Sequence, residues 1–294
     1  MKKIIFLILF LILNAYADNM GEELSVIPHL RMGVGARALG LGGAFVGLAD
    51  DATTTYWNPA GLGRISIYKT HISAMYTKMS YDRMYNFLSI YDRGDYGGVG
   101  LNWNNFMVDN IEERDESGEL KSLFNYSVNT FTVSYGNSIL DNFKAGLNLK
   151  YYYIKTGSSD AKGLGFDIGT LYKPFGPLFQ IGLVIQDVNF GIYWNTGKRD
   201  VIYPVVKCGF SYNIIYEKFI VVADIEKPFN TGFKTHFGTE YWLNEYFGIR
   251  GGLSEVNLTA GLSFKITNYQ VDYSYLLDNN NLGDIHRFSA LAYF

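Results

Sequence analysis

Residues 143–153, FKAGLNLKYYY, set the fold of this chain because apolar and polar side chains alternate along them. The side chains on one face are Ala145, Leu147, Leu149, Tyr151 and Tyr153. Those on the other face are Lys144, Gly146, Asn148, Lys150 and Tyr152. A period of two is the mark of a β-strand whose two faces meet different surroundings. The stretch therefore predicts a strand between an apolar and a polar environment.

The same alternation recurs from residue 66 to the end of the chain, for example in 163–172, 233–242 and 257–265. A soluble sandwich with one solvated face also alternates in this way. Here the polar face is rich in glycine as well as charge, and the apolar face often ends in tyrosine. Those features are typical of a lipid-facing band with aromatic belts around a polar lumen. The sequence predicts an all-β fold, a transmembrane antiparallel β-barrel.

About fourteen strands are predicted, an even number as in bacterial outer-membrane barrels. They are placed near 66–78, 83–92, 96–107, 127–136, 143–155, 163–173, 178–188, 203–213, 218–226, 233–242, 246–253, 257–265, 268–276 and 285–294. If the first strand starts on the periplasmic side, the two longest connections, 108–126 and 189–202, both face outward. Long outer loops and short inner turns are the rule for such barrels.

The composition agrees with a barrel and excludes several other classes. The chain has 294 residues, 17% of them aromatic, with 32 glycines and 6 prolines, which suits short strands and tight turns. The mean hydropathy of zero argues against a helical membrane protein. A net charge of -3 without a basic run predicts no nucleic-acid partner. Cys208 is the one cysteine, so no intramolecular disulfide forms.

Both ends of the chain carry export signals. Residues 1–17 are predicted to be a cleaved signal peptide, with Lys2 and Lys3 before an apolar run and small residues at the cleavage site. The apolar run, residues 4–13, is too short to span a bilayer core of about 30 Å. The last strand ends at Phe294, a pattern that the outer-membrane assembly machinery reads. The predicted location is the outer membrane.

Residues 31–63, RMGVGARALGLGGAFVGLADDATTTYWNPAGLG, are the least strand-like part of the chain. We expect them to form a plug, or hatch, inside the barrel lumen. The predicted domains are the signal peptide (1–17), the hatch (18–65) and the barrel (66–294). Residues 44–46 are expected to form a short strand, with a helical turn as the alternative.

Local signals in the hatch predict two helical turns. Asn58 is expected to cap a turn that begins at Pro59 and is closed by Gly61 in the left-handed region. Asp50 or Asp51 is expected to cap a preceding turn over 52–56. The hatch motif is defined by six residues: Asp50, Asp51, Asn58, Pro59, Ala60 and Gly61.

The sequence holds little that predicts chemistry. The HExxH, CxxC and GxSxG motifs are missing, so no enzyme activity, cofactor or metal is expected. His236 and Glu240, two inward positions apart, leave a hydrolytic pair as an alternative. The favoured interpretation is a polar lining that contacts the plug. That luminal lining comprises Lys144, Lys150, Asp167, Lys234, His236, Glu240, Arg250 and Asp272.

Residues 35–62, GARALGLGGAFVGLADDATTTYWNPAGL, closely resemble the N-terminal signature of the PorV/PorQ family, which belongs to the wider FadL-like group of outer-membrane barrels. Shorter stretches such as 165–169 and 182–189 agree. The resemblance implies a fourteen-stranded barrel closed by an N-terminal hatch with an Asn-Pro-Ala motif. Asn58, Pro59 and Ala60 match that motif residue by residue.

The resemblance also implies two functions. FadL-like members pass hydrophobic molecules, so passive transport of small hydrophobic compounds is expected, with ligand contacts at the outer mouth from Phe190, Tyr193 and Trp194. The alternative is a type IX secretion accessory that binds cargo proteins at the cell surface, as PorV-type members do. Expected partners are outer-membrane lipid, a hydrophobic small molecule or a secreted protein cargo, and the assembly machinery through Phe294.

Overall fold

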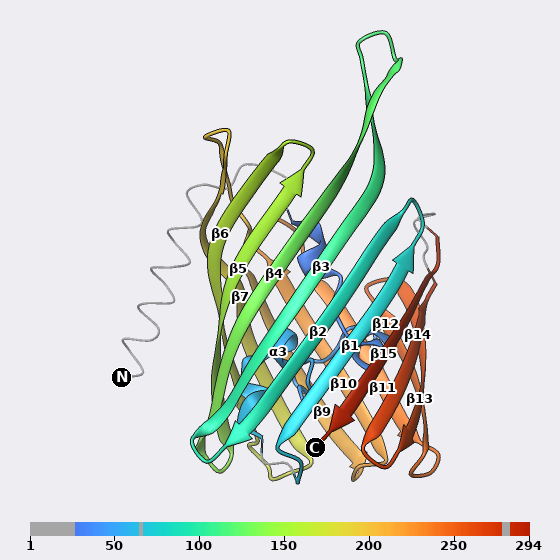
Figure 1. The fold of residues 1–294 in the computed structure, drawn as a ribbon. Helices are drawn as coiled ribbons and strands as arrows, with labels where there is room; N and C mark the ends of the chain where they lie inside the picture. Colours follow the sequence, from blue (N-terminus) through green and yellow to red (C-terminus); the bar gives the residue numbers. More distant parts are fainter. Residues whose placement is uncertain (1–26, 65–66, 278–282) are drawn as a thin grey trace.

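A β-sheet closed into a barrel dominates the computed structural model, which describes residues 27–64, 67–277 and 283–294 (Figure 1). The predicted signal peptide lies outside the described residues. Within the described part, no helix is long and apolar enough to cross a membrane. The end of the barrel that carries the long β3–β4 hairpin is called the outer end below, and the end with the C-terminus the inner end.

Fourteen antiparallel strands of the described residues form the wall. They are β1 (Thr70–Met79), β2 (Arg83–Gly94), β3 (Gly97–Arg114), β4 (Leu120–Leu140), β5 (Phe143–Thr156), β6 (Ser159–Tyr172), β7 (Phe179–Trp194), β9 (Val205–Ile215), β10 (Phe219–Pro228), β11 (Lys234–Trp242), β12 (Phe247–Ser254), β13 (Asn257–Ile266), β14 (Tyr269–Leu276) and β15 (Ile285–Tyr293). Pairing of β1 with β15 and of β6 with β7 closes the sheet. The predicted fourteen-stranded antiparallel barrel is confirmed.

The outward face of the wall is apolar. Five outward side chains on β3, β4, β5, β6 and β13 are 52 to 58% exposed, namely Leu101, Val133, Leu149, Leu164 and Leu262. Exposed tyrosines gather near the inner end, among them Tyr135, Tyr172, Tyr212 and Tyr269. Soluble proteins rarely expose so continuous an apolar surface, whereas a lipid-facing band flanked by an aromatic belt has this composition.

Two connections predicted as loops are largely strand. The predicted loop 108–126 is reduced to a turn between β3 and β4, whose hairpin projects well beyond the rest of the outer end (Figure 1). In the predicted loop 189–202, β7 runs on to Trp194 and the two-residue strand β8 (Arg199–Asp200) pairs back onto it. In both places β-bulges interrupt the regular alternation, but backbone pairing continues.

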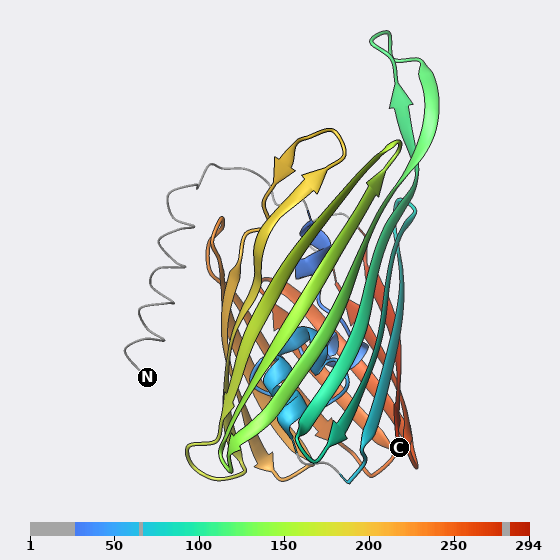
Figure 2. The same ribbon diagram turned by 60° about the vertical axis from the view of Figure 1, so that its left-hand side comes forward.

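Residues 27–64, called the luminal segment, lie inside the barrel (Figure 2). They form η1 (Pro28–Arg31), α2 (Ala36–Gly40), α3 (Thr54–Trp57) and η2 (Pro59–Gly63). The first of these lies toward the outer end and the last two toward the inner end (Figures 1 and 2). Within the part whose burial is described, almost every side chain is buried.

The strand predicted at 44–46 is wrong, because the segment turns there. The backbone N–H groups of Phe45 and Val46 donate to the Asp224 carboxylate of β10, at 2.7 and 2.8 Å. A single side chain thus satisfies two amides that a neighbouring strand would otherwise have to bind.

Candidate functional site

Asn58 holds the inner part of the luminal segment together. Its side-chain oxygen accepts from Ala60 N at 3.2 Å, so the predicted cap of the turn that begins at Pro59 is present. Its side-chain nitrogen donates to Val46 O at 3.0 Å and to Thr170 O of β6 at 3.1 Å. One fully buried amide therefore caps η2, braces the preceding turn and ties both to the wall.

The role predicted for Gly61 is wrong. Gly61 does not have a positive φ, and η2 instead ends at Gly63 with Arg64 in an extended conformation. Glycine is needed at position 61 for packing, because a Cβ there would lie 2.0 Å from Thr54 Oγ1 and 2.4 Å from Ala49 O. The turn is so tight against α3 that no side chain fits.

The two aspartates of the hatch motif both pair with Arg37 but differ in their shortest contacts. Asp51 accepts from Thr53 N at 2.8 Å and from Thr53 Oγ1 at 2.6 Å, which supports the turn that leads into α3. Asp50 accepts from Arg37 Nη1 at 2.5 Å. Asp50 or Asp51 was expected to cap this turn. Asp51 is the one that accepts hydrogen bonds there, whereas Asp50 forms an ion pair with Arg37.

Four glycines form a seat for η2 on the inner face of the wall. They pair with one another across β3 to β6, and we call them the glycine seat: Gly98, Gly136, Gly146 and Gly169. A Cβ on any of them would lie between 2.1 and 2.5 Å from Leu62, Pro59 or Asn58. The backbone of the luminal segment thus touches the backbone of the wall. The backbones also come this close at Gly182, which contacts Val46, and at Gly238 and Gly252, which contact Leu41.

On β11 to β14 the luminal segment is held by charge in addition to this close approach. Arg37 of α2 donates to Glu240 from Nε at 2.8 Å and from Nη2 at 2.9 Å. Arg250 donates to the same carboxylate at 2.6 Å and to Asp272 at 3.1 Å. These four residues are called the ionic anchor. Burial alone lowers the pKa of Arg37, but the carboxylates of Asp50 and Glu240 raise it well above its usual value.

Arg37 is the functional residue that the sequence analysis missed. It is the single cation in a run of glycine and alanine, and that isolation was the available signal. Its partner Glu240 lies 203 residues away in the sequence. Three residues of the predicted luminal lining, Glu240, Arg250 and Asp272, do come together around it.

A second ionic cluster lies nearer the outer end. Asp187, at a bulge in β7 with a φ of 60°, pairs with Arg31 of η1 and accepts from Lys150 at 2.6 Å. Lys150 also pairs with Asp167 at 2.8 Å, and Tyr152 donates to Asp187 at 3.0 Å. Lys150 and Asp167, both in the predicted lining, thus help to bind the luminal segment through Asp187 and Arg31.

The remaining residues of the predicted lining do not join these clusters. Lys234 pairs with Glu255 at 2.6 Å near the outer end, and Lys144 is buried near the inner end. His236 Nδ1 lies 2.7 Å from Gly42 O. Because His236 and Glu240 engage different partners, their arrangement gives no support to a hydrolytic pair.

The three residues predicted to contact ligand at the outer mouth lie on different sides of the wall. Phe190 and Tyr193 are 65% and 56% exposed, and Phe190 borders a concavity of about 670 Å³ that is lined by outward side chains such as Leu164 and Phe131. Trp194 packs against a buried apolar cluster instead. All three were predicted to lie in a loop, whereas they belong to β7, where register shifts against β6 break the strict alternation of sides.

That apolar cluster lines the outer part of the lumen and is called the outer apolar cluster. Its members are Ile27, Leu30, Val128, Tyr152, Ile154, Ala161, Ile192 and Ile202, with Tyr126 and Trp194 packed against it. Ile27 and Leu30 come from the luminal segment and the others from the wall and its β7–β9 connection. The sequence signal for it was apolar residues at inward positions, which the predicted polar lining left out.

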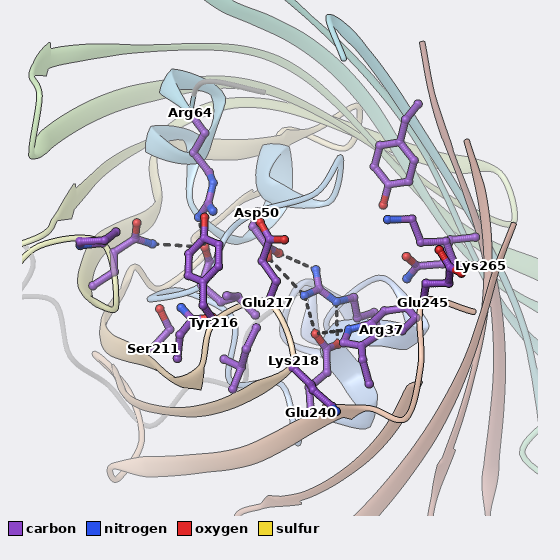
Figure 3. A pocket seen from close by; sticks show the side chains of 18 of the residues that line it. Arg37, Asp50, Arg64, Ser211, Tyr216, Glu217, Lys218, Glu240, Glu245 and Lys265 are labelled. Atoms are coloured by element: carbon purple, nitrogen blue, oxygen red, sulfur yellow. Dashed lines mark hydrogen bonds and ion pairs between the residues drawn. The ribbon is translucent and has the colours of Figure 1, made fainter. Parts of the chain in front are cut away.

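The inner end of the lumen is lined by charged side chains, unlike the outer apolar cluster. A cavity of about 770 Å³ lies there between the luminal segment and the β9–β10 and β11–β12 turns (Figure 3). Its lining carries both signs of charge, from residues that include Arg37, Asp50, Arg64, Glu217, Lys218 and Glu240. The luminal segment therefore separates an apolar outer lumen from a polar inner cavity. The described residues hold no group of three or more His, Cys, Asp or Glu that suits a metal ion.

The chain forms a barrel with an occupied lumen, and its overall fold is shared by solved structures. The fold is similar to that of a structure described as the CymD monoaromatic hydrocarbon channel, with 14% identity, a TM-score of 0.67, and coverage of 90% of this chain and 98% of that one. The toluene transporter TodX of Pseudomonas putida gives 13% identity and a TM-score of 0.66, over 88% and 96% of the two chains.

The toluene transporter TbuX of Ralstonia pickettii is also similar, with 13% identity and a TM-score of 0.62, over 89% of this chain and 98% of that one. No model of a known protein family and no curated protein sequence matches the chain. At these identities the likeness shows that the barrel fold is shared. Membership of the PorV/PorQ family stays a prediction.

Proposed function

We propose that this protein is an outer-membrane channel for the passive transport of small hydrophobic compounds, with the luminal segment as its hatch. The observation that carries the proposal is the outer apolar cluster. It packs aliphatic and aromatic side chains of the wall against Ile27 and Leu30, at the outer end of a segment that lies inside the barrel. Apolar linings with a few polar groups suit small hydrophobic ligands. The fold shared with two toluene transporters and a monoaromatic hydrocarbon channel agrees with this.

Export and membrane insertion follow from the same proposal. The apolar outer face with its tyrosines near the inner end suits insertion into a bilayer, and residues 1–17 act as the signal peptide. The protein has no catalytic role in this proposal, because the ionic clusters position the luminal segment.

The proposal is tested by uptake. Cells that produce the protein in their outer membrane are compared with cells that lack it, using radiolabelled solutes from monoaromatic hydrocarbons to long-chain fatty acids. Faster entry of at least one hydrophobic solute, with unchanged entry of a sugar control, is expected. Equal uptake of every hydrophobic solute in the two strains rules the proposal out.

The β3–β4 hairpin favours a second candidate, a secretion accessory that binds protein cargo at the cell surface. The hairpin projects beyond the barrel (Figure 1) and is braced by polar contacts, with Glu113 accepting from Lys121 at 2.8 Å and from Ser122 at 2.6 Å. A pull-down from outer membranes compares the full chain with a variant in which residues 111–124 are replaced by a short turn. A surface protein captured only by the full chain supports this candidate, and identical captures contradict it.

A further inference from the structure

Four cations meet at the inner end of the wall, beside the glycine seat. Arg64 directly follows η2, Arg93 lies near the end of β2, Lys144 begins β5, and Lys173 follows β6. Together they are called the cationic cluster. Arg64 and Lys173 line the inner cavity, and Figure 3 shows Arg64 reaching into it from the luminal segment.

The members of the cationic cluster are close enough to repel one another. Lys144 is repelled by both Arg64 and Arg93. Burial, followed by repulsion from Arg64 and Lys144, lowers the pKa of Lys173 to about 8. The fold brings these four parts of the chain together, because Arg93 donates to Leu62 O, two residues before Arg64, and Lys144 pairs with Leu171, two residues before Lys173.

Within the described part of the chain, no carboxylate is in direct contact with these four cations. None of the four cations forms an ion pair there. The nearby acids have other positions or partners: Asp50 pairs with Arg37, Asp92 accepts from Thr70, and Asp95 and Asp141 are exposed in turns. Glu217 lies on the β9–β10 turn across the cavity.

The side chains of the cationic cluster also have N–H groups that are free to donate hydrogen bonds to a ligand. The hydrogen bonds of Arg64 and Arg93 in the described part go from Nη1 to the carbonyls of Leu48 and Leu62, at 3.0 and 3.3 Å. The Lys144 ammonium has no hydrogen-bond partner among the described residues, and its nitrogen keeps contact with solvent although the residue as a whole is 7% exposed. Cations gathered without a counter-charge repel one another, which destabilises their charged forms. An anion with several acceptor oxygens would remove that cost.

We propose that Arg64, Arg93, Lys144 and Lys173 form a binding site for a phosphate group at the inner rim of the barrel. Phosphate carries up to two charges and matches the forked donors of arginine, while lysine adds point charges. The group has two sources. Tyr172, beside Lys173, is one of the exposed tyrosines near the inner end, which mark the level of lipid headgroups, so a phospholipid reaches the rim. A free phosphorylated solute reaches the same cations through the inner cavity.

Calorimetric titration of the full chain in dodecyl maltoside micelles tests the site. One arm adds inorganic phosphate against sodium chloride of equal ionic strength. The other adds micelles with phosphatidylglycerol against micelles with diacylglycerol, which lacks the phosphate. Saturable binding in the phosphate arm assigns the site to free solutes, and binding in the lipid arm alone assigns it to headgroups. Absence of binding in both arms overturns the proposal.

Two variants make the test specific. The double substitution Lys144→Met with Lys173→Met is expected to weaken the observed binding by about tenfold or more. Lys218→Met, which removes one charge from the same cavity at the β9–β10 turn, is the matched control and is expected to bind like the wild type. Equal affinities of all three proteins contradict the proposal. If the double variant fails to insert, the single substitution Lys173→Gln replaces it, since that side chain lies outside the strands.

Discussion

Two regions of the barrel wall, β3 to β6 and β11 to β14, hold the luminal segment through different kinds of contact. On β3 to β6, the glycine seat brings the backbone of η2 against the backbone of the wall. On β11 to β14, the ionic anchor holds α2 through Arg37, Glu240, Arg250 and Asp272. The first contact requires glycines, because any side chain at these positions would collide with η2. The second requires the charged side chains of the ionic anchor. The β3–β6 side is therefore sensitive to added atoms, whereas the β11–β14 side, where Gly238 and Gly252 also approach the luminal backbone, is sensitive to removed charges as well.

The largest effect is expected from Glu240→Ala in the ionic anchor. It leaves Arg37 and Arg250 buried without their shared carboxylate, and breaking a buried ion pair from one side costs about 4 kcal/mol. The measurement is urea unfolding in detergent micelles, followed by the gel shift between the folded and unfolded barrel. A loss below about 1 kcal/mol would mean that Asp50, Asp51 and Asp272 suffice to hold both arginines.

Gly146→Ala is expected to destabilise the glycine seat by about 3 kcal/mol, near the top of the range for overpacking. The added Cβ would lie 2.3 Å from the carbonyl carbon of Pro59, and backbone on both sides resists a shift. Gly251→Ala on β12 is the matched control, because a Cβ there has nothing within 4 Å. Equal unfolding midpoints for the two variants would show that the segment does not press on the wall at this point.

Asn58→Ala is expected to cost about 2 kcal/mol. The change removes the cap of η2, worth about 1 kcal/mol, and leaves the carbonyls of Val46 and Thr170 without a donor. Urea unfolding with the same gel readout measures it. Limited proteolysis shows whether the loss is confined to the luminal segment, because cleavage within 27–64 then increases while the barrel stays folded.

The smallest effect is expected at the outer end of the same wall as the ionic anchor. Lys234 and Glu255 pair at 2.6 Å but stay partly exposed, and such pairs contribute less than about 1 kcal/mol. Glu255→Ala is therefore expected to leave the unfolding midpoint almost unchanged. If Glu255→Ala lost as much stability as Glu240→Ala, burial would not explain the difference in strength expected between the two ion pairs.

The strands were predictable because each has one face toward an apolar environment and one toward a polar interior. Most of their bounds differ from the prediction by a few residues at most. The exceptions are β3, β4 and β7, whose outer ends run beyond the apolar band and so lose the pattern that locates them. The bulges of β7 explain why the side of Phe190 was not predictable, since one extra residue reverses every side chain that follows.

The luminal segment was harder to predict because its structure is set by contacts distant in sequence. The cap by Asn58 is local and could be read from the motif. The turn at 44–46 depends on Asp224, and the orientation of α2 depends on Glu240, each more than 170 residues away. The glycines on the polar faces indicated close approach, but only the barrel register places four of them side by side below η2.

Uptake of a monoaromatic hydrocarbon by Asn58→Ala cells tests most directly whether the luminal segment controls passage. Cells with equal amounts of folded wild-type, Asn58→Ala and Gly251→Ala protein are compared with cells that lack it. The expected result is faster uptake by the wild type than by cells without the protein, a rate at least about twofold different in Asn58→Ala, and a wild-type rate in Gly251→Ala. The same rate in all four strains would contradict a transport role for the barrel and for its luminal segment.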